Sequence, residues 1–130
     1  MKRRPMKRQL SPLDYSEFYR GVAERQTYRC WGCALAPNEV HKCLQRSDGR
    51  IDAHHLIAQQ VLRRELCGER LDAALRDHRN GVLVGRYHHG TLESRYMRGS
   101  FEDLPACAIA FAKTYDLLLH LERTYPVRVG

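Results

Sequence analysis

The sequence contains no apolar run that approaches the roughly 20 residues a membrane-spanning helix needs. Its N-terminus is basic, yet no hydrophobic signal core follows, so neither a membrane protein nor an exported one is expected. Five cysteines in such a chain are poor evidence for disulfides, because thiols stay reduced in the cytoplasm. We therefore expect a cytoplasmic protein whose cysteines serve metal binding, redox chemistry or packing.

Acidic residues are also scarce. The chain has 15 Asp and Glu against 22 Lys and Arg, a net charge of +7, and an isoelectric point near 9.4. This balance suits a polyanionic partner, most often nucleic acid. Residues 1–10 are predicted to form a disordered basic arm, which is either a solvated tail, a phosphate-contacting segment, or both. Its basic side chains are Lys2, Arg3, Arg4, Lys7 and Arg8.

The length of 130 residues suits one domain with a modest core, although the mean hydropathy is only −0.57. A capped helix is predicted near the N-terminus, with Ser11 as N-cap and Pro12 as its first residue. A polar loop is expected over 36–50, a strand over 50–57, and helical structure over 58–79 with a break at Gly68. A second strand is expected over 80–89, then helices over 89–99 and 106–125, the latter broken near Asp116. The pattern predicts an α+β fold.

The segment RIDAHHLI places His54 and His55 next to each other on the first predicted strand. Because neighbouring strand residues point to opposite faces, these histidines are not suited to the same task. One could bind a metal while the other faces an attacking water. An unperturbed histidine, with a pKa of about 6.5, is mostly neutral at pH 7 and can accept a proton. Alternatively, each histidine is an ordinary core or surface residue.

Two motifs, DAHHLI and RNGVLVGRYHH, resemble those of the HNH endonuclease family, which has the ββα-metal fold. The resemblance covers residues 30–97 and implies a nuclease domain over 11–97, with 98–130 as a helical extension packed on it. The family's His, Asn and His correspond to His55, Asn80 and His89. The resemblance implies that His55 is the general base and that Asn80 holds the loop that orients it. It also implies that His54 and His89 are catalytic metal ligands.

Two carboxylates are further candidates for this metal. Asp52 lies two residues before His54, on the same strand face, and Glu93 lies one helical turn after His89. Oxygen ligands matter because two imidazoles alone favour transition metals over Mg²⁺. The divalent metal is expected to be Mg²⁺, Mn²⁺, Ni²⁺ or Zn²⁺.

Many family members hold this core with a zinc ion bound by two CxxC pairs. The first pair is present as Cys30 and Cys33, whereas Gly85 and His88 stand where the second pair is expected. Structural zinc takes four ligands, and the fourth could come from Cys43 or from His41. Alternatively, the zinc site has decayed and the thiols are merely buried. A thiol redox motif is disfavoured because CWGC does not lie between a strand and a helix of a βαβ unit.

The resemblance implies a metal-dependent endonuclease that hydrolyses DNA phosphodiester bonds, in a phage or prophage setting with phage packaging proteins as further partners. Arginines of the helical insertion, among them Arg63 and Arg64, are candidates for backbone contacts, or they form an exposed helix face. The rival interpretation is a non-catalytic DNA- or RNA-binding zinc module that retains the HNH fold.

Overall fold

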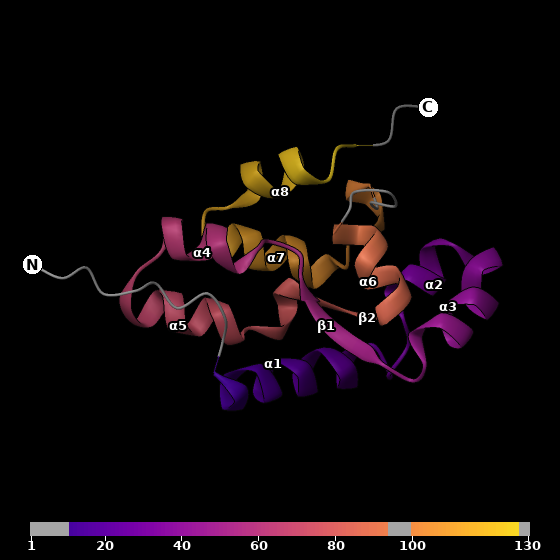
Figure 1. The fold of residues 1–130 in the computed structure, drawn as a ribbon. Helices are drawn as coiled ribbons and strands as arrows, with labels where there is room; N and C mark the ends of the chain where they lie inside the picture. Colours follow the sequence, from indigo (N-terminus) through magenta and orange to yellow (C-terminus); the bar gives the residue numbers. More distant parts are fainter. Residues whose placement is uncertain (1–10, 94–99, 128–130) are drawn as a thin grey trace, which may run out of the picture.

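The computed structural model of the protein describes residues 11–93 and 100–127, except for the side chains of residues 90–93. Its architecture is a small antiparallel sheet surrounded by helices, which agrees with the α+β class expected from the sequence (Figure 1). None of the helices in this part of the chain has the length and apolar character that crossing a bilayer requires. The basic arm, residues 1–10, lies outside the described residues, as do all five of its candidate DNA-contacting side chains.

Two strands form the sheet. β1 (Ile51–His55) pairs antiparallel with β2 (Gly81–Gly85), and the register sets His54 opposite Val82 and His55 opposite Gly81. Since side chains alternate along a strand, Asp52 and His54 share one face of the sheet with Val82 and Val84. The opposite face of β1 carries Ala53 and His55. The two histidines thus face different environments.

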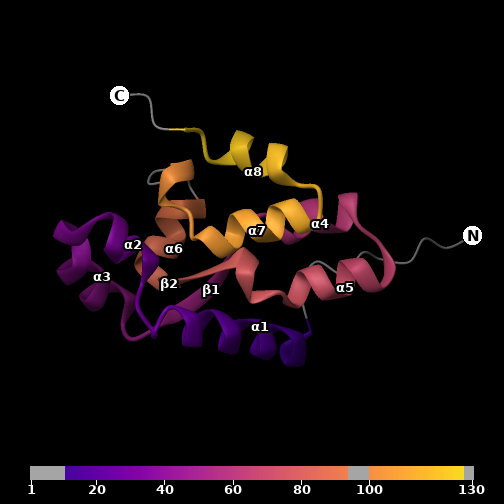
Figure 2. The ribbon, with the colours of Figure 1, turned by 180° about the vertical axis from the view of Figure 1, so that it is seen from behind.

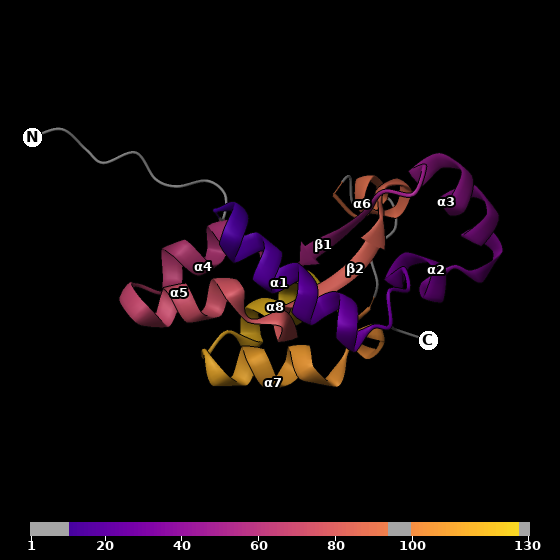
Figure 3. The ribbon, with the colours of Figure 1, turned by 90° about the horizontal axis from the view of Figure 1, so that it is seen from below.

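Helix α1 (Pro12–Arg25) covers the face that carries Ala53 and His55 (Figure 3). It begins as predicted, because the Ser11 hydroxyl accepts a hydrogen bond from the Asp14 backbone N–H at 3.2 Å and Pro12 follows the cap. Phe18 and Val22 are fully buried against the sheet. A side chain at Gly81 would collide with both, since its Cβ would come within 2.5 Å of each, so glycine lets the helix approach this closely.

The larger core lies on the other face of the sheet. It is formed by Val82 and Val84 together with α7 (Ala106–Thr114), α8 (Leu118–Thr124) and the insertion between the strands (Figures 1 and 2). α7 and α8 are separated at Asp116, whose φ of 57° ends the first helix as the sequence predicted. A short 3₁₀ helix, Phe101–Asp103 (η3), precedes them. The described part of the C-terminal segment therefore packs on the sheet that carries the histidines.

The connection between the strands is helical. It comprises α4 (Gln59–Glu65), α5 (Gly68–Arg76) and the 3₁₀ helix His78–Asn80 (η2). The break falls where the sequence predicted it, because Gly68 begins α5 with a φ of +61°, which favours glycine. α4 and α5 lie at one end of the molecule, and residues 30–47, which carry Cys30, Cys33 and Cys43, lie at the other (Figures 1 and 2).

Two predictions about secondary structure are wrong. The segment expected to be a polar loop contains the 3₁₀ helix Pro37–Glu39 (η1) and α3 (Val40–Ser47), and a short helix, α2 (Trp31–Leu35), lies just before it. α3 forms because Cys43 and Ser47, one turn apart, are both buried against the end of β2. The second strand ends at Gly85, and α6 (Arg86–Glu93) follows at once. His88 and His89 are therefore helical residues rather than strand residues.

Packing of α1 on the sheet predicts a large stability difference between two of its apolar residues. Phe18→Ala removes a fully buried ring and should lower the free energy of unfolding by about 3–5 kcal/mol. Leu13→Ala, on the same helix but with 83% of its surface exposed, should change it by less than about 0.5 kcal/mol. Urea unfolding of the two variants measures both values, and equal losses would contradict the assignment of this core.

Candidate metal centres

Three thiols and one imidazole converge at the end of the molecule formed by α2, α3 and the start of α6. The residues are Cys30, Cys33, Cys43 and His88. One ligand atom from each lies within 4.8 Å of all the others, and no other group in the described part of the chain meets that spacing. The Sγ atoms of Cys30 and Cys33 lie 3.4 and 3.9 Å from His88 Nδ1, and the Sγ atoms of Cys30 and Cys43 are 3.9 Å apart.

These separations match the edges of a tetrahedral metal site. Zinc binds sulfur at about 2.3 Å and imidazole nitrogen at about 2.0 Å, which places tetrahedral sulfurs about 3.8 Å apart and sulfur about 3.5 Å from nitrogen. The cluster can therefore hold a metal without a large rearrangement. His41, the other candidate for the fourth ligand, is an exposed residue of α3 and does not belong to the cluster.

Two glycines provide the space for this convergence. A Cβ at Gly85 would lie 2.6 Å from Cys43 Sγ, and a Cβ at Gly32 would lie 2.3 Å from the ring of His88. Gly85 is the position at which the sequence resemblance expected a cysteine. The sulfur of Cys43, a residue of α3, lies where a side chain at position 85 would otherwise extend. Cys43, one of the two candidates that the sequence offered for the fourth ligand, therefore completes the set of four.

Polar groups around the cluster hold its sulfurs in place. The Gly85 backbone N–H donates to Cys30 Sγ at 3.2 Å. Ser47 Oγ lies 3.4 Å from Cys43 Sγ and accepts a hydrogen bond from the Tyr87 backbone N–H at 3.0 Å. These contacts tie α3 to the first turn of α6, and such outer contacts orient metal ligands.

Burial, together with the neighbouring sulfurs of Cys30 and Cys43, raises the pKa of the Cys33 thiol to about 12. The pKa of His88 is lowered, because burial disfavours its cationic form. The imidazole is therefore ready to bind a cation, whereas the thiols must give up protons to do so. A cation bound here would replace those protons, and its affinity would rise with pH.

A second group of candidate ligands gathers on the sheet face opposite α1. His89 Nδ1 lies 3.2 Å from Asp52 Oδ2, and the rings of His54 and His89 meet edge to face with centroids 5.1 Å apart. The side chains of His89 and Asp52 are 24% and 41% exposed, so solvent can reach them. Of the four expected catalytic ligands, the structure thus places His89 beside both Asp52 and His54, but the three ligand atoms are not as close to one another as those of the cysteine cluster. The side chain of the fourth, Glu93, lies outside the described residues.

His55 is held in one orientation on the α1 side of β1. Its ring stacks on Phe18 with centroids 4.0 Å apart, and its Nε2–H donates to the Leu75 carbonyl at 3.1 Å. Nδ1 is then the acceptor nitrogen, and the side-chain amide of Gln59 approaches it at 3.5 Å. Burial lowers the pKa of His55 to about 4, with the nearby charge of Arg63 as a smaller cause, while the bond to Leu75 acts in the opposite direction. The ring is neutral at physiological pH.

Asn80 holds the loop that follows β1. Its side-chain oxygen accepts the Ile57 N–H at 2.9 Å, its side-chain amide donates to the Ile57 carbonyl at 3.0 Å, and its own carbonyl accepts the Leu56 N–H at 2.8 Å. The residue is 1% exposed, so these bonds are screened from water. Asn80 thereby fixes the exit of the strand that carries both His54 and His55.

Most arginines of the insertion have acidic neighbours. Arg64, Arg70, Arg76 and Arg79 lie within 4.0 Å of carboxylate oxygens, and the closest pair is Arg79 with Asp77 at 2.8 Å. Arg63 is half-buried, and desolvation lowers its pKa. The sequence did not reveal these pairings, because only Arg64 and Glu65 are adjacent. Gln59 was also missed, since no motif marks its approach to His55.

Comparison with known proteins gives no match to this chain among family models, curated proteins or solved structures. The HNH resemblance therefore rests on its motifs, and functional conclusions rest on the geometry described above.

The geometry of the cysteine cluster predicts that the purified protein carries about one tightly bound zinc ion. Cys43→Ser should release it as fully as Cys30→Ser does, with a marked loss of stability, because each supplies one of four ligands. Cys67→Ser, at an exposed cysteine outside the cluster, is the matched control and should retain the metal. Metal analysis and thermal unfolding of the three variants test this; zinc-free, well-folded wild-type protein would refute it.

The environment of His55 predicts an unusual titration. Because its folded-state pKa of about 4 lies below that of the unfolded chain, its contribution to stability is complete above about pH 6.5 and is lost as the pH falls toward 4. The loss should approach 3 kcal/mol, about 1.4 kcal/mol per pH unit. Histidine ring NMR signals followed against pH measure this directly, and a His55 signal that titrates near pH 6.5 would show that the ring is not buried.

Proposed function

We propose that this protein is a metal-dependent endonuclease of the HNH type that hydrolyses DNA phosphodiester bonds. The observation that carries the proposal is the meeting of Asp52, His54 and His89 on one sheet face, beside a loop that Asn80 holds. One carboxylate and two imidazoles form a ligand set suited to Mn²⁺, Ni²⁺ or Zn²⁺, and the oxygen also accommodates Mg²⁺. When bound, the metal would polarise the scissile phosphate and stabilise the leaving 3′ oxygen.

His55 is the proposed base. The Leu75 carbonyl fixes the tautomer that keeps a lone pair on Nδ1, and the same carbonyl would stabilise the imidazolium formed when Nδ1 takes a proton from water. Gln59 Oε1 is buried and accepts no hydrogen bond from the described residues, so a water donor would be stabilised close to His55. Asn80 supports this step by holding the loop between His55 and Gln59.

The charge balance favours DNA as the substrate. The chain has a net charge of +7, and its first eight residues contain no acid, which favours contacts with phosphates regardless of sequence. Because Arg64 already has a carboxylate neighbour and Arg63 is half-buried, we assign more of the affinity to the basic arm than to these two arginines.

A second candidate function is a non-catalytic nucleic-acid-binding module stabilised by metal. The observation that favours it is the burial of His55, which packs on the sheet face opposite His54 and whose pKa of about 4 makes it a weak base. The Cys30, Cys33, Cys43 and His88 cluster serves either function, because it supports the fold rather than the chemistry. The two functions differ in whether DNA is cut.

Plasmid cleavage measured against metal concentration separates the roles of the two adjacent histidines. His54→Ala should weaken the catalytic metal, so added Mn²⁺ should recover part of the rate. His55→Gln, whose amide can still donate to Leu75, should lose roughly 10²- to 10⁴-fold in rate without recovery by metal. His41→Ala, at an exposed histidine outside both centres, is the control and should cleave normally.

DNA binding and thermal unfolding are followed for each variant, so that loss of cleavage is not mistaken for loss of the fold. Full activity in excess chelator would eliminate the metal-dependent mechanism. Folded wild-type protein that binds DNA but cuts none with Mg²⁺, Mn²⁺, Ni²⁺ or Zn²⁺ would establish the binding module instead.

A further inference from the structure

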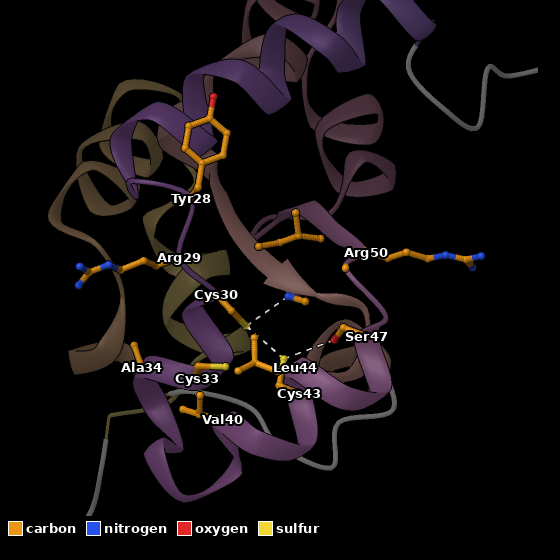
Figure 4. A pocket seen from close by; sticks show the side chains of 13 residues that line it. Tyr28, Arg29, Cys30, Cys33, Ala34, Val40, Cys43, Leu44, Ser47 and Arg50 are labelled. Atoms are coloured by element: carbon orange, nitrogen blue, oxygen red, sulfur yellow. Dashed lines mark hydrogen bonds between the residues drawn. The ribbon is translucent and has the colours of Figure 1, made fainter.

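A pocket of about 530 Å³ lies beside the cysteine cluster, between α3 and the start of β1 (Figure 4). Its walls are mainly aliphatic, with Val40 and Leu44 from α3 and Ile51 from β1, and Tyr28 stands at one end. Leu44 is 72% exposed and Tyr28 is 63% exposed. These side chains form an apolar surface that the described part of the chain leaves open to solvent.

The charges at the pocket have one sign. Arg29 and Arg50 both line it, and Figure 4 shows them extending from its two sides in opposite directions. None of its lining residues is Asp or Glu. Both side chains extend outward from the pocket, so a positive charge lies on either side of a ligand that fills the apolar centre, which suits carboxylates placed on the two flanks of an apolar group rather than inside the pocket.

The walls favour an amino-acid side chain over a nucleotide base. A base that leaves water needs partners for its ring nitrogens and exocyclic groups, since each buried polar atom without one is costly. The aliphatic walls provide none. Of the two hydroxyls among the lining residues, Ser47 Oγ already accepts from the Tyr87 N–H and lies 3.4 Å from Cys43 Sγ, whereas Tyr28 stands at one end of the pocket and is 63% exposed. A leucine, methionine or aromatic side chain has few or no polar atoms that need such partners.

We propose that this pocket binds a partner protein through a short extended segment in which one bulky apolar residue is flanked on both sides by acidic residues. The apolar side chain packs between Leu44, Val40 and Ile51, and the flanking carboxylates pair with Arg29 and Arg50. This interaction is independent of DNA cleavage, because the pocket uses neither Asp52, His54 nor His89. The pocket wall depends on the metal centre, since Cys30, Cys33 and Cys43 all line it.

The probes are fluorescent five-residue peptides, Glu-Asp-X-Asp-Glu, in which X is Phe, Leu, Trp or Met. At least one should bind about tenfold or more tightly than the same peptide with Ser at X, and a Lys-Lys-X-Lys-Lys peptide should not bind. Leu44→Asp should weaken binding by about tenfold or more, because it places a charge in the apolar contact. Leu119→Asp is the matched control, since Leu119 is 68% exposed on α8, and it should bind as the wild type does.

The double variant Arg29→Glu, Arg50→Glu should bind the acidic peptides more weakly, and the binding that remains should no longer weaken as the salt concentration rises. Failure of all four apolar peptides to bind the zinc-loaded full chain overturns the proposal, as does equal loss of affinity in Leu44→Asp and Leu119→Asp. The pocket would be assigned to nucleic acid instead if an octamer of thymidine nucleotides binds, if Leu44→Asp weakens that binding, and if none of the peptides binds. None of these outcomes depends on nuclease activity, so the two proposals fail separately.

Discussion

The antiparallel pairing of β1 with β2 is the constraint on which both candidate centres depend. It divides β1 into a face toward α1 and a face toward α6, which separates His55 from His54 even though they are adjacent. The start of β2 also follows directly from Asn80, whose side chain holds the loop leaving β1. At its other end, β2 stops at Gly85, and α6 follows with a residue in each of the two candidate centres.

The first turn of α6 joins the two centres. His88 points into the cysteine cluster, while His89 meets Asp52 and His54. Consecutive helical residues diverge in direction, so one turn can supply a ligand to each site. His88 can pack against α2, and Cys43 against the end of β2, only because Gly32 and Gly85 lack side chains. Since His88 and His89 belong to the same helical turn, a metal held by His88 would also fix the position of His89. The structural centre and the proposed catalytic centre share a rigid element.

The environment of His55 sets stability against the role of general base that we propose for it. Stacking on Phe18 and the bond to Leu75 keep the ring in one orientation and one tautomer, which a base requires. The same burial lowers its pKa to about 4, below the range in which a general base works best at neutral pH. Local packing thus fixes the orientation of the ring but lowers its basicity. The pKa of His55 would rise only if substrate binding changed the surroundings of the ring.

Several features follow from the sequence alone, because they depend on neighbouring residues. The Ser11–Pro12 cap, the break at Gly68 and the opposite directions of His54 and His55 are all local properties of backbone and period. The tertiary structure alone decided that α3 is a helix and that Cys43, rather than a residue at position 85, completes the cluster. It also decided the burial of His55 and the pairing of Arg70 with Asp116 and of Arg76 with Glu17. These depend on contacts between segments far apart in the chain, such as Cys43 with Gly85 and Phe18 with His55, which no local pattern encodes.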